Sequence, residues 1–511
     1  MRVLEGLQPQ SVFYYFEEIT RIPHGSGNVK QISDYLRQFA RDKGLECVQD
    51  ELFNIIIVKE ATPGYEQEEP YILQGHMDMV AVSAPDCGID MTKEPLKLCV
   101  ENGRIHAEGT SLGGDDGIAV AYALALLAAD DISHPRLEVI LTVDEETGME
   151  GAKGIDLSML RGKRLINLDQ EEEGVVITSC AGGARVDVTI PLQEESVMEP
   201  DREEEKAAGQ TDDGRQVLRL KIAGLLGGHS GIEINKGRGN ANYLTGRILQ
   251  GLSERFGICL TAMHGGLADN AIPREAEAVF EVDITQAEAA AAYVQEEADR
   301  IRQELGDRDP AFTAGCTIVD PQEYGNGNND GAKKQESGSY DAASTARALA
   351  CLCKLPNGVI AMSRELEGLV QTSLNLGVVT LHQGALKLSY AVRSSVEEDK
   401  EALCRQMQEI AEASGAETEV RNAYTGWAYR KDSPLRDIIV DVYEKMYGSK
   451  PVLEAIHAGV ECGILAAKIP GLDCVSIGPD MSDVHTAQES LDIASVQRMW
   501  EYLLAVLAYK C

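Results

Sequence analysis

The sequence contains no hydrophobic segment long enough to cross a lipid bilayer. Its longest uninterrupted apolar run, residues 118–129, has 12 residues, whereas a transmembrane helix needs about 20. The first residues, MRVLEGLQPQ, contain one arginine but not the apolar stretch of a signal peptide. We therefore expect a protein that is neither inserted into a membrane nor exported, and we predict a cytoplasmic location.

Basic residues are scarce relative to acidic ones. The 511 residues include 47 Lys and Arg against 83 Asp and Glu, which gives a formal net charge of −36. Binding to phosphate groups depends on clustered Lys and Arg, and anionic membrane surfaces attract the same side chains. The composition therefore argues against nucleic acid and against membranes as partners.

C-x-x-C pairs are also absent, although the chain has 12 cysteines. Without an export signal, scattered cysteines are typical of reduced thiols in a cytosol rather than of disulfides. We interpret them as small core residues and not as zinc ligands.

The length and the hydrophobic content predict more than one domain with ample core. Hydrophobic residues make up 44% of the chain, and a single domain rarely exceeds about 250–300 residues. Helical and strand patterns alternate over residues 1–184, which predicts an α/β domain around a mostly parallel sheet. The pattern becomes that of an α+β domain at 185–423 and returns to the first type at 424–511. We therefore predict an inserted domain at 185–423, with solvated loops at 194–206 and 323–341.

Polar clusters follow three predicted strands of the first domain. The strands at residues 71–74, 137–143 and 164–168 lead into the sequences GHMD, DEETG and DQEEEG. Functional groups in open α/β sheets gather at the carboxyl ends of the strands. We therefore expect these clusters to form one site.

His76 and Asp78 are the first pair of interest. Residues two apart in an extended chain point the same way, so both side chains can face one cavity. Asp78 would then accept a hydrogen bond from the second imidazole nitrogen, which is the usual arrangement around a metal-bound histidine. Taken alone, such a pair is also common in purely structural positions.

Asp115 and Asp116 lie between glycines, directly before a helix predicted at residues 117–129. Adjacent acids at a helix N-terminus are often plain caps. The flanking glycines, however, permit an unusual backbone that could turn one carboxylate into a cavity.

Two imidazoles and three carboxylates together form the donor set expected for a pair of borderline divalent ions such as zinc. These residues are His76, Asp115, Glu146, Asp169 and His485. A bridging carboxylate would hold two ions about 3.5–4 Å apart. Glu145 is an additional acid that remains to act as general base.

In their order and wording, the motifs resemble those of the aminoacylase/carboxypeptidase superfamily of co-catalytic zinc peptidases, and within it the bacterial Xaa-His, or cytosolic nonspecific, dipeptidases. The resemblance covers essentially the whole chain. It includes RIPHGSGN, QGHMDMV, GTSLGGDDGIA, TVDEETGMEGA, NLDQEEEG, GGHSGIEI, DNAIPREA, LPNGVIAMS, TSLNLGVV, IHAGVECGIL and SIGPDMSDVH. It implies a phosphorylase/hydrolase-like α/β catalytic domain with an inserted α+β lid domain.

The resemblance also implies a metal centre with two Zn²⁺ ions per chain, for which Mn²⁺ or Co²⁺ could substitute. It implies that His76 and Asp169 bind one ion, that Glu146 and His485 bind the other, and that Asp115 bridges them. The peptide bond between Asp115 and Asp116 is expected to be cis.

Further roles follow from the same resemblance. Asp78 would orient His76, and Glu145 would be the general base toward the attacking water. In the lid domain, His229 would polarise the scissile carbonyl. Substrate-binding positions are implied for Asn270, Arg393 and Gly459.

The implied activity is hydrolysis of unblocked dipeptides, including Xaa-His. An N-acyl-amino-acid deacylase with the same metal centre and a non-catalytic metal-binding protein remain alternatives. The oligomeric state also remains open, because His229 could act within its own chain or across a homodimer. The chain departs from the pattern after His485, where it reads TAQES and relatives tend to have Ser-Pro-Asp-Glu.

Overall fold

The structure of the chain, a computed structural model, forms two compact units. The residues that it describes are 2–194, 214–319, 339–364 and 368–510. The first unit combines Met1–Cys180 with Thr425–Cys511, and the second unit is Ala181–Tyr424. Most of both predicted loops, at 194–206 and 323–341, lies outside the described residues.

The first unit is built around a mixed eight-stranded sheet with the order β1-β2-β6-β3-β7-β21-β8-β20. Its strands are β1 (Glu46–Gln49), β2 (Ile55–Lys59), β3 (Tyr71–His76), β6 (Leu137–Thr142), β7 (Arg164–Asn167), β8 (Val175–Cys180), β20 (Val452–Ile456) and β21 (Asp473–Ser476). The central strands β6, β3, β7 and β21 are parallel, whereas β2 pairs antiparallel with β6 and β8 meets β21 antiparallel. The strands predicted at 71–74, 137–143 and 164–168 are confirmed as β3, β6 and β7.

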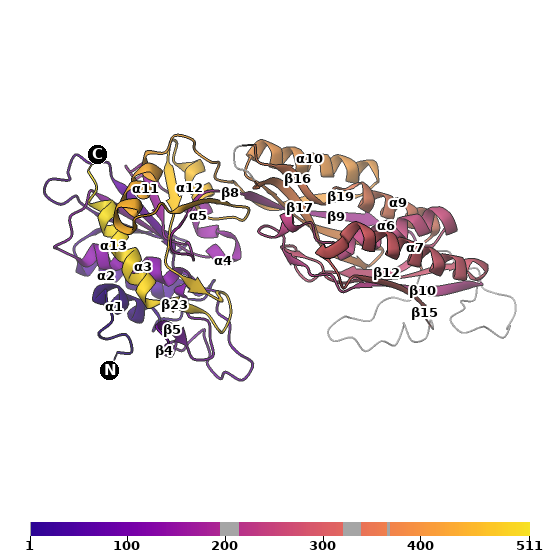
Figure 1. The fold of residues 1–511 in the computed structure, drawn as a ribbon, viewed down its shortest axis with the longest axis horizontal. Helices are drawn as coiled ribbons and strands as arrows, with labels where there is room; N and C mark the ends of the chain where they lie inside the picture. Colours follow the sequence, from indigo (N-terminus) through magenta and orange to yellow (C-terminus); the bar gives the residue numbers. More distant parts are fainter. Residues whose placement is uncertain (1, 195–213, 320–338, 365–367, 511) are drawn as a thin grey trace. The chain divides into compact units, whose positions relative to one another are not determined.

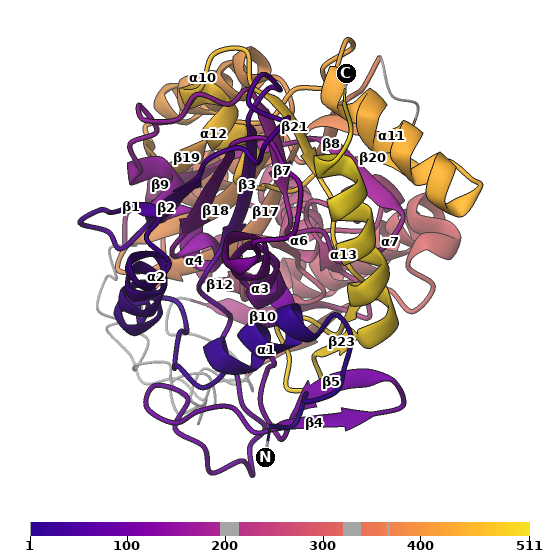
Figure 2. The same cartoon turned by 90° about the vertical axis from the view of Figure 1, so that its left-hand side faces the viewer.

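Helices cover both faces of this sheet. They are α1 (Gln10–Ile19), α2 (Lys30–Asp42), α3 (Gly114–Ala128), α4 (Glu145–Gly148), α5 (Glu150–Gly154), α11 (Pro434–Tyr447), α12 (Cys462–Lys468) and α13 (Ile493–Leu507). Residues of α1, α2, α3, α11 and α13 share one hydrophobic core with the sheet (Figures 1 and 2). Every residue of β3 and β6 is buried, as is typical of strands covered on both faces.

A small four-stranded sheet pairs strands from the two chain segments that make up the first unit. It has the order β22-β23-β5-β4. Its strands are β4 (Leu98–Glu101), β5 (Arg104–Ala107), β22 (Met481–Ser482) and β23 (Ser490–Asp492). The segment between β22 and β23 carries His485, so this sheet holds both ends of that segment.

Helix α3 is buried along almost its whole length, as its uniformly apolar sequence predicted. It begins at Gly114, three residues before the predicted start, and Asp115 and Asp116 have non-helical backbone angles. The peptide bond between these two residues is cis, which confirms the expectation drawn from the resemblance.

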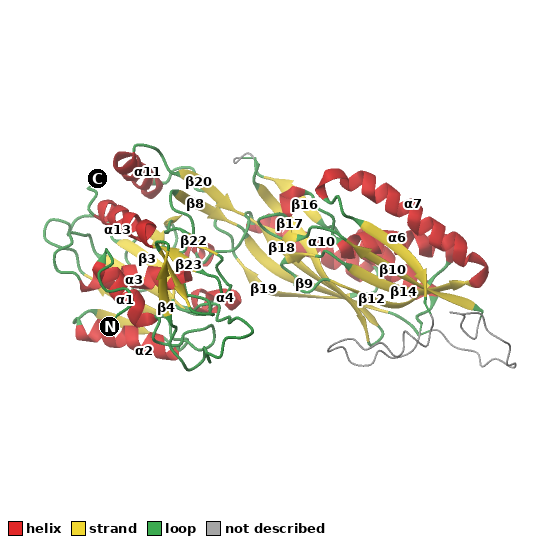
Figure 3. Cartoon of the chain, turned by 60° about the horizontal axis from the view of Figure 1, so that its bottom comes forward, coloured by secondary structure: helices red, strands yellow, loops and turns green. Residues whose placement is uncertain are grey.

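The second unit is an α+β layer structure. Its nine-stranded antiparallel sheet has the order β15-β10-β14-β12-β17-β18-β9-β19, with β16 beside β17. The strands are β9 (Gly182–Pro191), β10 (Arg215–Ala223), β12 (Cys259–Gly265), β14 (Ala276–Asp283), β15 (Thr313–Ile318), β16 (Gly358–Met362), β17 (Val370–His382), β18 (Ala385–Ser394) and β19 (Glu417–Tyr424). Helices α6 (Ala241–Phe256), α7 (Ala287–Leu305), α9 (Ala342–Lys354) and α10 (Glu397–Ala413) share one core with the sheet (Figure 3). The described part of this unit also contains short 3-10 helices at Ile234–Lys236, Ile284–Gln286 and Gly306–Arg308.

This unit contains two similar halves. The first half runs β10, α6, β12, β14, α7, β15, and the second runs β9, α9, β17, β18, α10, β19. Their strand orders mirror each other about β12 and β17, which pair at the centre of the sheet. The whole first half is inserted between β9 and α9 of the second.

Membrane-spanning helices and disulfides can also be examined in the described residues. None of the helices in that part of the chain combines the length and the apolar character needed to cross a membrane. None of the cysteines described there forms a disulfide, and Cys180, Cys259, Cys351, Cys404, Cys462 and Cys474 are buried.

Gly75, between Gln74 and His76 on β3, lets α3 approach the sheet. A Cβ atom at this position would lie 2.4 Å from Oδ2 of Asp116 and 2.6 Å from Cβ of Ala119. We expect Gly75→Ala to lower the free energy of unfolding by about 1–3 kcal/mol, because overpacking displaces well-packed neighbours. Urea unfolding followed by circular dichroism measures this. Gly88→Ala is the control, because its Cβ would meet no atom within 4 Å; equal unfolding midpoints for both variants would contradict the close approach.

Candidate metal centre

Three neighbouring strands place the predicted ligands at one edge of the sheet. His76 is the last residue of β3, the acids of α4 follow β6, and Asp169 comes two residues after β7. Since β3 runs parallel to both β6 and β7, these side chains follow the same ends of their strands. His485 reaches the site from the segment between β22 and β23.

Asp115 lies between the two imidazoles. Its Oδ1 is 3.1 Å from Nε2 of His76, and its Oδ2 is 3.0 Å from Nε2 of His485. Glu146 Oε1 is 2.9 Å from the same His485 nitrogen, and Asp169 Oδ1 is 3.5 Å from Nε2 of His76. The five residues predicted as ligands therefore meet, with one carboxylate oxygen of Asp115 facing each histidine.

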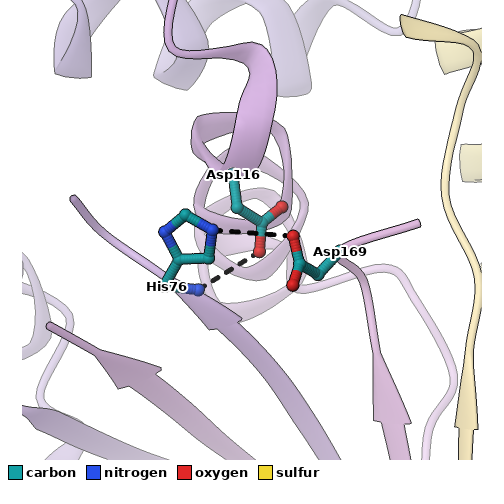
Figure 4. Close-up of side chains that lie close together, drawn as sticks. All are labelled: His76, Asp116 and Asp169. Atoms are coloured by element: carbon teal, nitrogen blue, oxygen red, sulfur yellow. Dashed lines mark hydrogen bonds and ion pairs between the residues drawn. The ribbon is translucent and has the colours of Figure 1, made fainter. Parts of the chain in front are cut away.

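Asp116 lies beside this cluster, and Figure 4 shows its carboxylate directed toward His76 and Asp169. The side chain is fully buried, and its Oδ2 accepts the backbone N–H of His76 at 3.1 Å. Its Oδ1 has no hydrogen-bond partner among the described residues. Asp116 therefore fixes the backbone of His76, and burial raises the pKa of its carboxyl well above the usual range.

Asp78 connects His76 with the turn that carries Glu145. Its Oδ1 is 3.4 Å from Nδ1 of His76 and accepts the backbone N–H of Glu145 at 3.2 Å. The hydroxyl of Ser26 donates to its Oδ2 at 2.8 Å. Ser26 was missed in the sequence, where its only signal was the motif RIPHGSGN.

Burial and close contacts shift the pKa values of the titratable groups at this site. Burial raises the pKa of Asp169 to about 7 and the pKa of Glu145 well above its usual range. Hydrogen bonds with Asp115 and then Glu146 raise the pKa of His485 to about 11. Burial raises the pKa of Asp115, but the bonds from His485 and His76 outweigh it and leave that pKa below its usual range. The raised pKa values mean that these side chains bind protons readily. Bound cations would supply the same positive charge.

The donor groups fit divalent cations. Three sets of ligand atoms each lie within 4.8 Å of one another: His76 with Asp116 and Asp169, His76 with Glu145 and Glu146, and Asp115 with Glu146 and His485. Imidazole together with carboxylate is a donor set that zinc and similar ions accept. The second and third sets share Glu146, and Asp115 touches both histidines, so two ions would be neighbours here.

Glu489 holds the backbone from which Asp115 projects. It is buried, and its two carboxylate oxygens accept the four backbone N–H groups of residues 112–115 at 2.8–3.3 Å. It stands four residues after His485, the place of the glutamate in the Ser-Pro-Asp-Glu of relatives. The segment TAQES after His485 therefore still contains a glutamate, Glu489, to which the sequence alone assigned no role.

His229 lies in the second unit, in the short strand β11 (Gly228–His229), which pairs with β13 (Ala271–Ile272). Its Nδ1 accepts the backbone N–H groups of Gly231 at 3.2 Å and Ile232 at 3.1 Å. Burial lowers the pKa of His229, and the charge of Arg393 lowers it further. A neutral imidazole in this setting carries its proton on Nε2, so that Nε2–H is available as a donor.

The backbone around Asn270 is fixed on both sides. Its carbonyl oxygen accepts the N–H of Ser230 at 2.8 Å. Nδ2 of the buried Asn375 donates to the carbonyl oxygens of Asp269 at 3.0 Å and Ala271 at 2.8 Å. Asn375 was another residue without a predicted role, although it belongs to the motif TSLNLGVV.

Arg393, on β18, is buried and forms no ion pair with a described carboxylate. Its Nη1 is 3.4 Å from the hydroxyl of Tyr424, and its Nε has no partner among the described residues. The nearby acid Asp269 pairs instead with Arg185 at 2.6 Å. The guanidinium therefore keeps donors for an anionic group.

The predicted site residues thus fall into two groups by unit. The ligand set, Asp78 and Glu145 come together in the first unit, and His229, Asn270 and Arg393 belong to the second. Gly459 belongs to the first unit, in the loop between β20 and α12.

Known proteins share the sequence and the fold of this chain. The family described as Peptidase family M20/M25/M40 matches residues 72–509. The chain is 35% identical over 507 residues to the cytosol non-specific dipeptidase of Escherichia coli (strain K12), covering 99% of both chains. The crystal structure of aminoacylhistidine dipeptidase from Vibrio alginolyticus matches with a TM-score of 0.86 at 34% identity, over 99% of this chain and 97% of that one. An aminopeptidase from Bacillus cereus shares the fold, with a TM-score of 0.57 at 16% identity and 98% coverage of each chain.

Proposed function

The chain belongs to peptidase family M20/M25/M40, and we propose that it is a cytoplasmic two-zinc dipeptidase that hydrolyses unblocked dipeptides, including Xaa-His. The observation that carries this proposal is the position of Asp115, whose two oxygens face the two imidazoles. The names of the Escherichia coli and Vibrio relatives, a cytosol dipeptidase and an aminoacylhistidine dipeptidase, support the substrate class and the location.

The distances support the ligand roles that the resemblance implies. His76 and Asp169 would hold one ion, Glu146 and His485 would hold the other, and Asp115 would lie between them. Two Zn²⁺ ions, or Mn²⁺ or Co²⁺ in their place, supply Lewis acidity at the scissile carbonyl and lower the pKa of a water to about 7. Asp78 keeps His76 in the orientation that the site needs, because its backbone carbonyl oxygen is 2.9 Å and its Oδ1 3.4 Å from Nδ1 of His76.

Glu145 moves the proton during hydrolysis. It is an acid beyond the five ligands, yet it lies within 4.8 Å of His76 and Glu146. As general base it takes the proton of the attacking water, and as general acid it returns this proton to the amine of the departing residue.

Residues of the inserted domain, 185–423, bind the scissile carbonyl and the terminal carboxylate of the dipeptide. His229 donates its Nε2–H to the oxyanion that develops on the carbonyl, and Asn270, the residue directly before β13, contributes a further donor. The planar fork of Arg393 holds the carboxylate of the dipeptide. We propose that this domain acts as a lid that closes over substrate bound near Gly459.

The substrate class can be tested directly. We expect the zinc-reconstituted protein to cleave a panel of free dipeptides and to cleave their N-acetylated forms much more slowly, because a dipeptidase recognises the free α-amine. Release of free amino acids, measured by chromatography, decides this. Preference for the acetylated forms would favour an N-acyl-amino-acid deacylase, and zinc binding without any hydrolysis would favour a non-catalytic protein.

The role of Glu145 has its own test. Glu145→Gln should keep both metals and lower kcat by about 10²–10⁴-fold, since a positioned general base typically contributes this much. Metal analysis by mass spectrometry accompanies the kinetics. Glu150→Gln is the matched control, an acid of the same segment that is exposed and paired with Lys153. Turnover of Glu145→Gln close to that of the control would exclude the assigned role.

The two lid residues should separate kinetically. Arg393→Ala should mainly raise KM, because it removes a contact to the substrate carboxylate in both ground and transition state. His229→Ala should mainly lower kcat, because its bond strengthens as the oxyanion forms. Both variants should retain wild-type zinc content. Loss of metal in either variant, or wild-type kinetics in both, would contradict these roles.

A further inference from the structure

One buried carboxyl group close to the strand ends that carry the proposed ligands has no part in the proposed hydrolysis. Glu461 ends the loop that contains Gly459, directly before α12, and its side chain is 1% exposed. Its Oε2 accepts hydrogen bonds from Nε2 of Gln74 at 2.5 Å and from the hydroxyl of Thr142 at 2.6 Å. The group thus joins α12 to two strands of the sheet.

Strand periodicity relates these partners to the metal centre. Gln74 precedes His76 by two residues on β3, so the two side chains point to the same face. Thr142 stands opposite His76 in the ladder between β3 and β6 and is the last residue before the turn to Glu145. The partners of Glu461 are therefore neighbours of His76: Gln74 on the same strand and Thr142 on the adjacent strand.

The same network reaches a third strand. Oε1 of Gln74 accepts a hydrogen bond from Nδ2 of Asn167 at 2.7 Å, and Asn167 precedes Asp169 by two residues. Asn167, Gln74, Glu461 and Thr142 form a continuous chain of buried polar side chains. The chain connects the ends of β7, β3 and β6.

We propose that Glu461 is a positioning residue that locks the Gly459 loop onto the strand ends that carry His76, Glu145 and Asp169. This inference rests on the proposed function, because it assigns to Glu461 the alignment of that centre. Glu461 touches neither metal nor substrate and acts through Gln74 and Thr142.

The group works through hydrogen bonds and does not need a charge. Its Oε1 has no hydrogen-bond partner among the described residues, and an ionised carboxylate with an unpartnered buried oxygen is unfavourable. Burial raises the pKa of Glu461 to about 8, in agreement with this. An amide in its place would keep the acceptor oxygen for Gln74 and Thr142. Alanine would leave the Thr142 hydroxyl only the longer contact with the carbonyl oxygen of Gly75 at 3.2 Å, and Nε2 of Gln74 only the contact with Thr142 at 3.4 Å.

The test compares Glu461→Gln with Glu461→Ala in the full chain. Zinc affinity is measured on metal-depleted protein by competition with a chelating indicator, without substrate. We expect alanine to weaken zinc binding 10–100-fold, the usual effect of losing a group that orients metal ligands, and glutamine to stay within about threefold of wild type. On dipeptides, the alanine variant should show a lower kcat and a higher KM, and glutamine should restore both.

A second variant covers the case in which Glu461→Ala does not fold. Thr142→Val keeps the shape of the side chain and removes only the hydroxyl, and we expect a smaller loss of zinc affinity of the same kind. If both single variants fold, their combination should be less than additive, since both break the same link.

Glu138 provides the matched control. It is fully buried at the opposite end of β6, where it accepts bonds from Arg136 and from the backbone N–H groups of residues 161 and 162. Glu138→Ala should lower the melting temperature without changing zinc affinity. Wild-type zinc affinity in Glu461→Ala, or equal losses in the glutamine and alanine variants, would overturn the proposal. Zinc binding by wild type without dipeptide cleavage would overturn the proposed function and leave the result for Glu461 standing.

Discussion

Everything at this centre depends on holding carboxyl groups of like charge together at one buried edge of a sheet. Their repulsion is strong where water is excluded, so each acid needs a donor, a proton or a cation. Asp115 meets this need with both oxygens, because each faces a different imidazole. Its backbone is fixed by Glu489, which accepts four consecutive N–H groups. The close approach of α3 to Gly75 then brings the aspartate to the end of β3.

Much of this fold could be predicted from the sequence, because its elements have strong local patterns. The apolar runs of β3, β6 and β7 and most of helix α3 lie where the sequence predicts them. The start of α3 could not be predicted locally. The backbone N–H groups of Gly114 and Asp115 donate to Glu489, a residue more than 370 positions away along the chain. The mirrored halves of the second unit were equally hidden, because the first half is inserted into the second and their resemblance lies in topology rather than in residues.

The candidate site divides in the same way. The acids and histidines at strand ends were visible, since strand alternation and the motif order both pointed to them. The residues that were missed, among them Ser26, Glu461 and Asn375, make no direct contribution to a donor set. Each acts on a neighbour brought close only by the fold: Ser26 on Asp78, Asn375 on the carbonyls flanking Asn270, and Glu461 on Gln74. A single sequence does not distinguish such residues from ordinary polar core.

The charge of the centre also bears on what it can bind. If all were ionised, the six carboxyl groups around His76 would carry six negative charges, two more than a pair of divalent ions balances; they are Asp78, Asp115, Asp116, Glu145, Glu146 and Asp169. Such surroundings favour a free ammonium group and disfavour a second carboxylate, so a zwitterionic dipeptide is accommodated only if its carboxylate finds a cation elsewhere. Arg393 is suited to this, because it is buried without an acidic partner among the described residues while Asp269 is occupied by Arg185. An acylated amino acid would bring the same carboxylate but no ammonium group, so nothing in it would compensate the excess of negative charge. On the proposed reaction, the acids that hold the metals and the arginine of the inserted domain thus select the two ends of an unblocked dipeptide.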